Sequence, residues 1–125
     1  MATAAQRDEI EARRAVLETE LQDPAILRDA KALAERSRAH ADVLLKLEKF
    51  AELDRLDRMT ADGKATLTST TDHELRALAE EEIASASAQR AAISAALDEL
   101  LAPQDPLDAK DIIVDPLDDL LNSQN

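Results

Sequence analysis

Cysteine, tryptophan and tyrosine are absent from this 125-residue chain, which contains one glycine and one phenylalanine. Without cysteine there is no disulfide framework and no thiolate metal site, which fits a reducing compartment. A single glycine argues against tight β-hairpin turns and phosphate-binding glycine loops. Aromatic side chains normally supply much of the buried area of a globular core. Their scarcity indicates an aliphatic core between packed helices.

Long apolar runs and an excess of basic residues are also missing. No stretch approaches the roughly 18 apolar residues of a membrane-spanning helix. The first residues, Met1 to Asp8, have no hydrophobic stretch of a signal peptide. The chain has 15 basic and 27 acidic residues, for a net charge of -12. We therefore expect a cytoplasmic protein with no membrane association and no direct nucleic-acid binding, whose partners have basic surfaces.

The residues that are present favour long helices. Apolar residues make up 45% of the chain and charged residues 34%. Ala, Leu, Glu, Arg and Lys are prominent, as in coiled coils. We expect an all-α fold, namely a long antiparallel helical hairpin or three-helix coiled-coil-like array with a short irregular C-terminal tail. The predicted helices span about residues 4–21, 24–59 and 72–101 of a helical domain at 1–102, and residues 103–125 are the predicted hinge and tail.

Apolar side chains at three- and four-residue spacings mark the predicted buried faces. In the first helix these residues are Ile10, Leu17 and Leu21. In the second helix they are Ile26, Ala30, Leu33, Ser37, His40, Leu44 and Leu47, followed by Phe50, Leu53 and Leu56. In the third helix they are Leu75, Leu78, Ala79, Glu82, Ile83, Ala86, Ile93, Leu97 and Leu100. Between Ile83 and Ile93 the residues are mostly Ala and Ser, which predicts a close approach of two helices.

Local signals predict the start of the second helix. Pro24 cannot continue a helix from upstream, but it suits the first position of a new helix. Asp23 is the predicted cap of that helix. Asp29 is a candidate cap for a restart after a short first turn.

The turn of the hairpin is predicted from composition. Gly63, the only glycine, lies in a predicted break at residues 60–64, and a run rich in Thr and Ser follows at residues 66–71. Thr71 to Glu74 has the spacing of a capping box, in which a hydroxyl and a carboxylate satisfy each other's backbone donors. Pro103 is expected to end the last helix.

The tail after residue 103 differs from the helical part. The β-branched residues 112–114 predict a short strand, and residues 115–121 predict one or two capped amphipathic turns. The run at 117–121 either docks in a groove of another protein or belongs to a tail that folds back or stays loose. A calcium loop needs a central glycine and a closing glutamate, so we expect a solvated segment at the tail acids. These acids are Asp105, Asp108, Asp111, Asp115, Asp118 and Asp119.

No arrangement of side chains predicts chemistry, so we expect no enzyme activity, no cofactor and no catalytic, cofactor-binding or metal-binding residue. His40 has no second His or Cys three or four residues away, which predicts a buried or half-buried packing role with one hydrogen bond. His73 is expected in the first turn of a helix, and residues 80–82 on a helix surface. No nucleophile has a base at a recognisable spacing. The hydroxyl residues expected in turns and caps are Thr66, Thr68, Ser69 and Thr70.

Five strings follow one another along the chain and carry a resemblance. They are Leu21-Gln22-Asp23-Pro24, Leu33 to Arg38, Asp72 to Ile83, Leu100 to Pro106, and Asp108 to Val114. The specific part is the Leu-Leu-x-Pro-x-Asp-Pro-x-Asp string with an apolar strand after it. Together they resemble the first domain of bacterial class I peptide chain release factors, most of all the type that reads UAA and UAG. The resemblance covers about residues 8–114.

The resemblance implies a helical domain that projects from a termination factor. It would touch the stalk-base protein of the large ribosomal subunit and contact a recycling GTPase. In the family the strand leads into Arg-Ala-Gly-Thr-Gly-Gly, and the codon-reading tripeptide and the Gly-Gly-Gln loop for peptidyl-tRNA hydrolysis lie further on. Here Val114 is followed by Asp115, and none of these elements occurs in the sequence. No functional residue of the family can therefore be placed on this chain.

Two functions of different classes stay open on the sequence. One is a release-factor first domain, either excised or naturally truncated. The other is a free-standing coiled-coil adaptor or dimerisation protein without a ribosomal role. A homodimer is compatible with both, because a helical array of this length can leave an apolar stripe exposed. A Gly-Thr-Gly-Gly continuation and a later Gly-Gly-Gln in the native gene would establish the first function. A stop codon after Asn125 would favour the second function or a paralogue that has lost catalysis.

Overall fold

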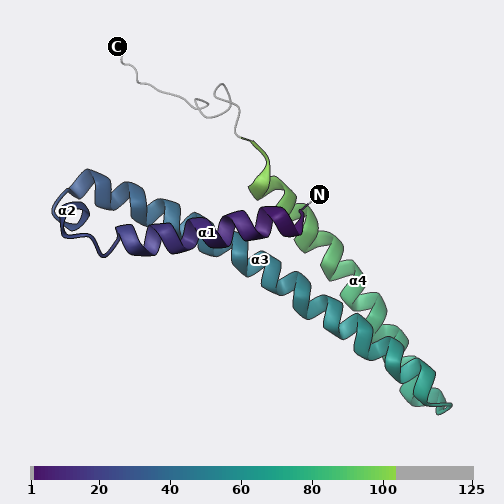
Figure 1. The fold of residues 1–125 in the computed structure, drawn as a ribbon. Helices are drawn as coiled ribbons and strands as arrows, with labels where there is room; N and C mark the ends of the chain where they lie inside the picture. Colours follow the sequence, from purple (N-terminus) through teal and green to yellow (C-terminus); the bar gives the residue numbers. More distant parts are fainter. Residues whose placement is uncertain (1, 104–125) are drawn as a thin grey trace.

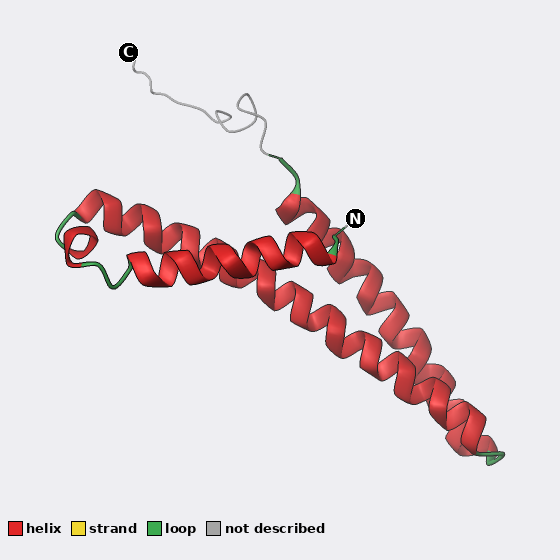
Figure 2. Ribbon diagram, in the orientation of Figure 1, coloured by secondary structure: helices red, strands yellow, loops and turns green. Residues whose placement is uncertain are grey.

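Four helices make up almost all of the described chain. The structure is a computed structural model that describes residues 2–103. The helices are α1 (Ala4–Glu20), α2 (Pro24–Leu27), α3 (Ala30–Ser69) and α4 (His73–Leu101). Within residues 2–103 there is no strand, and loops are confined to the helix connections and the two ends (Figure 2). The predicted all-α class is confirmed.

The central element is α3, and the other helices lie along it (Figure 1). The first half of α3 is paired with α1, the second half is paired with α4, and α2 contacts α3 near its start. We define α1, α2 and residues 30–50 as the N-terminal wing, and residues 51–69 with α4 as the hairpin wing. The start of α1 and the end of α4 meet beside the middle of α3, where the two wings join.

The core is aliphatic, with the single phenylalanine at its centre. Leu17, Leu56 and Leu97 are fully buried, one from each of the three long helices. Phe50 and Leu53 of α3 form a cluster with Leu97 at the junction of the wings. Full burial of one such side chain stabilises a fold by roughly 1.5–3 kcal/mol. The junction therefore ties all three long helices together.

Aspartate residues cap three of the four described helices. The Asp23 carboxylate accepts a hydrogen bond from the backbone N–H of Ala25 at 2.9 Å, with Pro24 at the first helical position. The Asp29 carboxylate accepts from two N–H groups in the first turn of α3, both at 3.1 Å. The predicted restart at Asp29 is confirmed. The helix expected over residues 24–59 is therefore divided into α2 and α3.

The predicted break around Gly63 is wrong, because α3 continues through it to Ser69. A Cβ atom at Gly63 would lie 2.6 Å from Ile83 Cγ1 and 3.3 Å from the Ala79 carbonyl oxygen. Both of these residues belong to α4. Gly63 is thus required for the close approach of α3 and α4, and not for a turn.

The Thr- and Ser-rich run after Gly63 is also helical as far as Ser69, which corrects the predicted turn. The Thr66 hydroxyl donates to the carbonyl oxygen of Asp62 at 3.1 Å, and the Thr68 hydroxyl donates to that of Ala65 at 2.9 Å. Such bonds satisfy a hydroxyl inside a helix without ending it. The connection between α3 and α4 is therefore reduced to residues 70–72.

The cap of α4 is Asp72 and not the predicted Thr71. The Asp72 carboxylate accepts hydrogen bonds from the N–H groups of Glu74 at 2.9 Å and Leu75 at 3.2 Å. A carboxylate is preferred here because it also meets the positive end of the helix dipole. At the other end, α4 stops at Leu101, two residues before Pro103, as expected from the proline.

The buried face of α4 differs from the prediction at two leucines. Leu75 and Leu78 are 50% and 61% exposed, whereas Ala79 and Ala86 are buried. Glu82, expected on the same face, is exposed as well. Small residues form the interface because α3 comes closest at Gly63. The leucines consequently lie beside the helix contact and not within it.

The buried face of α3 differs from the prediction at one of the two heptad positions, whereas Leu33, His40 and Leu47 are partly buried and Phe50, Leu53 and Leu56 are buried as expected. Val43 is 6% exposed and Leu44 is 40% exposed. Two other predicted heptad positions, Ala30 and Ser37, are also exposed. Val43 lies seven residues before the buried Phe50, so the period was right and one of the two heptad positions was assigned one residue too late. The periodicity alone cannot separate two adjacent apolar residues.

The remaining predictions concern the tail. The expected strand at residues 112–114, the acidic residues and the run at 117–121 lie outside the described residues. Among residues 2–103, no helix has the length and apolar character needed to span a membrane.

Candidate interaction surfaces

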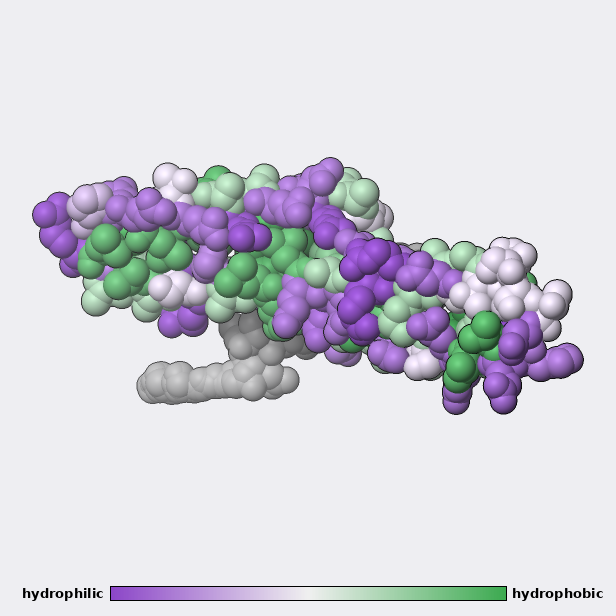
Figure 3. Space-filling model, turned by 90° about the horizontal axis from the view of Figure 1, so that it is seen from below, coloured by the Kyte–Doolittle hydropathy of each residue, from purple (hydrophilic) through white to green (hydrophobic). Residues whose placement is uncertain are grey.

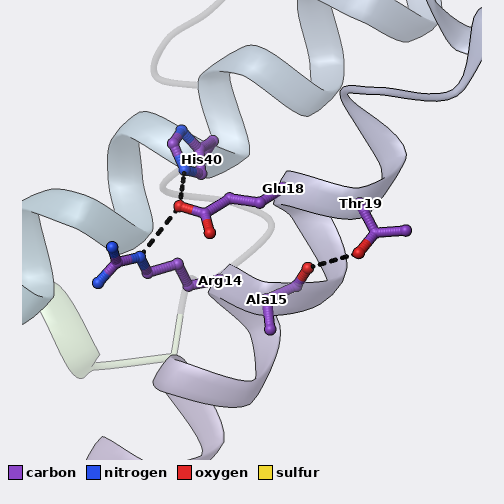
Figure 4. A network of polar contacts seen from close by, with 5 residues as sticks. All are labelled: Arg14, Ala15, Glu18, Thr19 and His40. Carbon is purple, nitrogen blue, oxygen red and sulfur yellow. Dashed lines mark hydrogen bonds and ion pairs between the residues drawn. The ribbon is translucent and has the colours of Figure 1, made fainter.

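Glu18 connects α1 to α3 in the N-terminal wing (Figure 4). Its carboxylate accepts a hydrogen bond from Arg14 Nε at 3.1 Å and lies 3.1 Å from His40 Nε2. The His40 side chain is 23% exposed, so the predicted buried or half-buried packing role is confirmed, as the half-buried case. In the same wing, Arg36 Nε donates to Glu20 Oε1 at 3.1 Å. Side-chain ion pairs therefore link α1 to α3.

The basic partners of Glu18 lower the pKa of its carboxyl group. The hydrogen bond with His40 is the largest cause, and the hydrogen bond from Arg14 is the second. The carboxylate thus stays ionised to a lower pH than an ordinary glutamate. Among residues 2–103, no three His, Cys, Asp or Glu side chains are grouped to hold a metal ion. This network has the chemistry of a helix contact.

Two arginines from different helices reach neighbouring acids in the middle of α3. Arg7 of α1 donates from Nη1 to Asp54 Oδ2 at 2.8 Å, and its guanidinium lies 5.5 Å from the centre of the Phe50 ring. Arg90 of α4 donates from Nε to Asp57 Oδ1 at 2.6 Å. Hydrogen bonding to Asp57 raises the pKa of the Arg90 guanidinium. These pairs surround the junction of the two wings.

Sequence reasoning missed these long-range pairs, and no sequence signal marks them. Spacings of three and four residues report contacts within one helix, whereas Arg7 and Asp54 are 47 residues apart. The other residues considered for chemistry do not converge. His73 is the first residue of α4 and is exposed, as are residues 80–82.

A groove runs along one side of the hairpin wing near its free end. From α3 it is lined by Met59 and Thr66. From α4 it is lined by Leu75, Leu78, Ala79, Glu81, Glu82 and Ser85. In Figure 3 a small hydrophobic area stands among hydrophilic atoms at this end of the molecule. The two leucines mispredicted as buried thus belong to an apolar surface with acidic neighbours.

Other exposed apolar side chains lie on the N-terminal wing. They are Val16, Leu27, Leu44 and Leu45, and each is between 40 and 50% exposed. Figure 3 shows extended hydrophobic areas over this part of the molecule. The two ends of the protein therefore both offer apolar side chains to solvent.

The fold and its polar network define an elongated all-α protein built on one long central helix. Comparison with known families gives a match to the PCRF domain over residues 10–115. The chain belongs to the PCRF domain family. No solved structure matches this chain.

Several bacterial proteins named peptide chain release factor 1 are similar to this chain. The protein of Bacillus anthracis is 35% identical over 95 residues, which are 76% of this chain and 27% of that protein. The protein of Acidobacterium capsulatum is 34% identical over 108 residues, or 86% of this chain and 30% of that protein. The protein of Bacillus subtilis is 32% identical over 106 residues, or 85% and 30%. The chain thus spans less than a third of the length of these relatives.

Proposed function

We propose that this chain is the helical domain of a peptide chain release factor and acts in translation termination. The observation that carries the proposal is the family match over residues 10–115, supported by the relatives named peptide chain release factor 1. The domain contacts other components and takes no direct part in codon reading or in peptidyl-tRNA hydrolysis. It has no enzyme activity by itself and needs no cofactor.

The proposed partner is the ribosome, at the protein of the large-subunit stalk base, with a recycling GTPase as a further contact. The net charge of -12 supports a basic protein surface as the site of contact. Complementary charge speeds association and selects the partner, and salt weakens the attraction between the two charged surfaces. In this proposal the helical domain spans residues 1–102, residues 103–125 are the hinge and tail, and the protein acts in the cytoplasm.

The test is sedimentation of the chain with purified ribosomes and with separated subunits. We expect the chain to sediment with large subunits at about 0.05 M salt and to be released at about 0.5 M, where the screening length is only a few ångströms. Small subunits should retain none of it. Excess Bacillus subtilis peptide chain release factor 1 should displace the bound chain. No binding to large subunits at low salt would contradict the proposal and favour a coiled-coil adaptor.

A release assay tests the absence of chemistry. Ribosomes stalled at a UAA codon with a labelled peptide should keep the peptide when the chain is added alone. The same ribosomes should lose it when intact peptide chain release factor 1 is added. Release by the chain alone would show that it contains a hydrolytic element.

A further inference from the structure

The groove of the hairpin wing has the geometry of a receptor for a helix. On α4, Leu75, Leu78, Glu82 and Ser85 are spaced by three, four and three residues, and Met59 and Thr66 are seven residues apart on α3. These spacings set side chains along one side of two paired helices, where a third helix packs between them. The part of α4 from Leu75 to Ser85 is about 15 Å long, or nearly three turns.

The floor of the groove is apolar and exposed. Leu75 and Leu78 are half or more exposed, and the buried Ala79 lies between them and α3. A partner that covers both leucines binds favourably, because their apolar area is then removed from water. Because both leucines are exposed, a small molecule would leave much of its own surface in water, whereas a helix would cover both side chains.

The rim of the groove is acidic. Glu81 and Glu82 line it, and Glu74 lies beside Leu78 and Glu81 on the outer side of α4. All three glutamates are exposed. A partner that places Lys or Arg on both sides of an apolar stripe would complement this rim. Phosphate groups of RNA would be repelled by it. A second copy seated here by two-fold symmetry would bring the same acids together.

We propose that this groove binds a basic amphipathic helix of a partner protein. The apolar stripe of that helix covers Leu75 and Leu78, and its basic side chains meet Glu74, Glu81 and Glu82. This inference deepens the proposed function and rests on it for the biological partner, while the binding mode rests on the groove alone.

The test uses synthetic peptides and no ribosomes. The probe is a fluorescent peptide of about 18 residues with leucines at positions i, i+3, i+4 and i+7 and lysines on both flanks. One control peptide carries glutamate in place of lysine, and another carries serine in place of leucine. We expect only the probe to bind the chain, with an affinity that falls as salt is raised.

Variants of the chain locate the binding. The double variant Leu75→Ala/Leu78→Ala should weaken probe binding at least about tenfold, which is the effect of losing a central apolar contact. The matched control is Leu27→Ala, because Leu27 of α2 is as exposed as Leu75 but lies at the other end of the molecule. Exposure of all three leucines predicts that these variants keep the fold, which circular dichroism checks.

Charge is tested in the same way. Glu81→Gln/Glu82→Gln should weaken binding and reduce its salt dependence, whereas Asp8→Asn/Glu48→Gln, which removes two exposed charges elsewhere, should do neither. Equal binding of the lysine and glutamate peptides, or unchanged binding by the leucine double variant, would overturn the inference. So would a dimer of the chain that the leucine double variant converts to monomer. None of these results depends on ribosome binding, so failure here is separable from failure of the proposed function.

Discussion

The two wings of this protein hold their helices together by different means. In the N-terminal wing, charged side chains connect the helices through Glu18 with His40 and through Glu20 with Arg36. In the hairpin wing, α3 and α4 are so close that a Cβ atom added at Gly63 would lie only 2.6 Å from the Ile83 side chain. The Glu18 and Glu20 contacts depend on ionisation and salt, and the approach at Gly63 depends on shape, but both wings also bury apolar side chains and Arg90 pairs with Asp57 in the hairpin wing. One long helix, α3, takes part in both.

This difference decides which substitutions each wing tolerates. Half-exposed ion pairs contribute little each, since side-chain entropy and screening offset most of the attraction. A close-packed contact does not tolerate added volume, because an added methylene must displace its neighbours. The hairpin wing should therefore be sensitive to added volume at Gly63, and the N-terminal wing should be sensitive to pH through Glu18.

The largest expected effect is the loss of folding stability when one buried leucine in each wing is truncated. Leu56→Ala and Leu17→Ala should each destabilise the fold by about 2–5 kcal/mol, the usual cost of a cavity at a fully buried leucine. Urea denaturation measures this. Hydrogen exchange should show that Leu17→Ala exposes the amides of α1 first, whereas Leu56→Ala affects both wings through α3. Equal loss of protection in all helices of both variants would remove the distinction between the wings.

The next effect tests shape in the hairpin wing. Gly63→Ala should destabilise the protein by about 1–2 kcal/mol, because overpacking against Ile83 outweighs the gain in helix propensity. Adding Ile83→Ala removes the atom nearest to the new methyl group and should recover part of the loss. A matched site is the exposed Ala65, where Ala65→Gly should cost about 1 kcal/mol from propensity alone. A stabilising Gly63→Ala would show that the two helices can separate freely.

A smaller effect tests the ion pair beside the junction. Arg7→Met keeps an apolar stem near Phe50 and removes the charge that pairs with Asp54. The expected loss is about 0.5 kcal/mol for such a half-exposed pair. A double-mutant cycle with Asp54→Asn isolates the coupling, which should disappear at about 1 M salt. Coupling that persists at that salt concentration would indicate a pair shielded from solvent.

The smallest effect is the pH dependence of the N-terminal wing. The pKa of Glu18 is lower in the folded chain, so its contribution to stability is complete above the ordinary glutamate pKa of about 4.3. That contribution is lost as the pH falls from there through the lower pKa of the folded state. Titration by NMR should show the lowered pKa, and Glu18→Gln should remove this part of the pH dependence. An unshifted Glu18 titration would contradict the contact with His40.

Much of the fold could be predicted from the sequence, since it is encoded locally. Caps at Asp23 and Asp29, a proline after α4 and apolar residues at helical spacing all act over a few residues. The all-α class and the half-buried His40 followed from such signals. The resemblance to the release-factor family likewise rested on short strings, and the family match confirms it.

Several of the errors share one origin, which is the contact between separate helices. Gly63 was expected to break α3 because the sequence does not reveal Ile83 on the opposite helix. Because of the same contact, Leu75 and Leu78 lie beside the helix interface and are exposed, so the groove could not be predicted. The arginine pairs at the junction were missed for the same reason. Such contacts depend on how the helices meet in space.

The unbroken course of α3 has a consequence for the whole molecule. Its 40 residues form a single rod of about 60 Å that runs through both wings and carries the exposed Leu44 and Leu45 in one wing and Met59 and Thr66 of the groove in the other. The number of residues between these positions therefore sets how far apart they lie and how they are turned about the helix axis. One residue inserted into α3 near the junction would lengthen the rod by about 1.5 Å and turn one end by about 100° relative to the other.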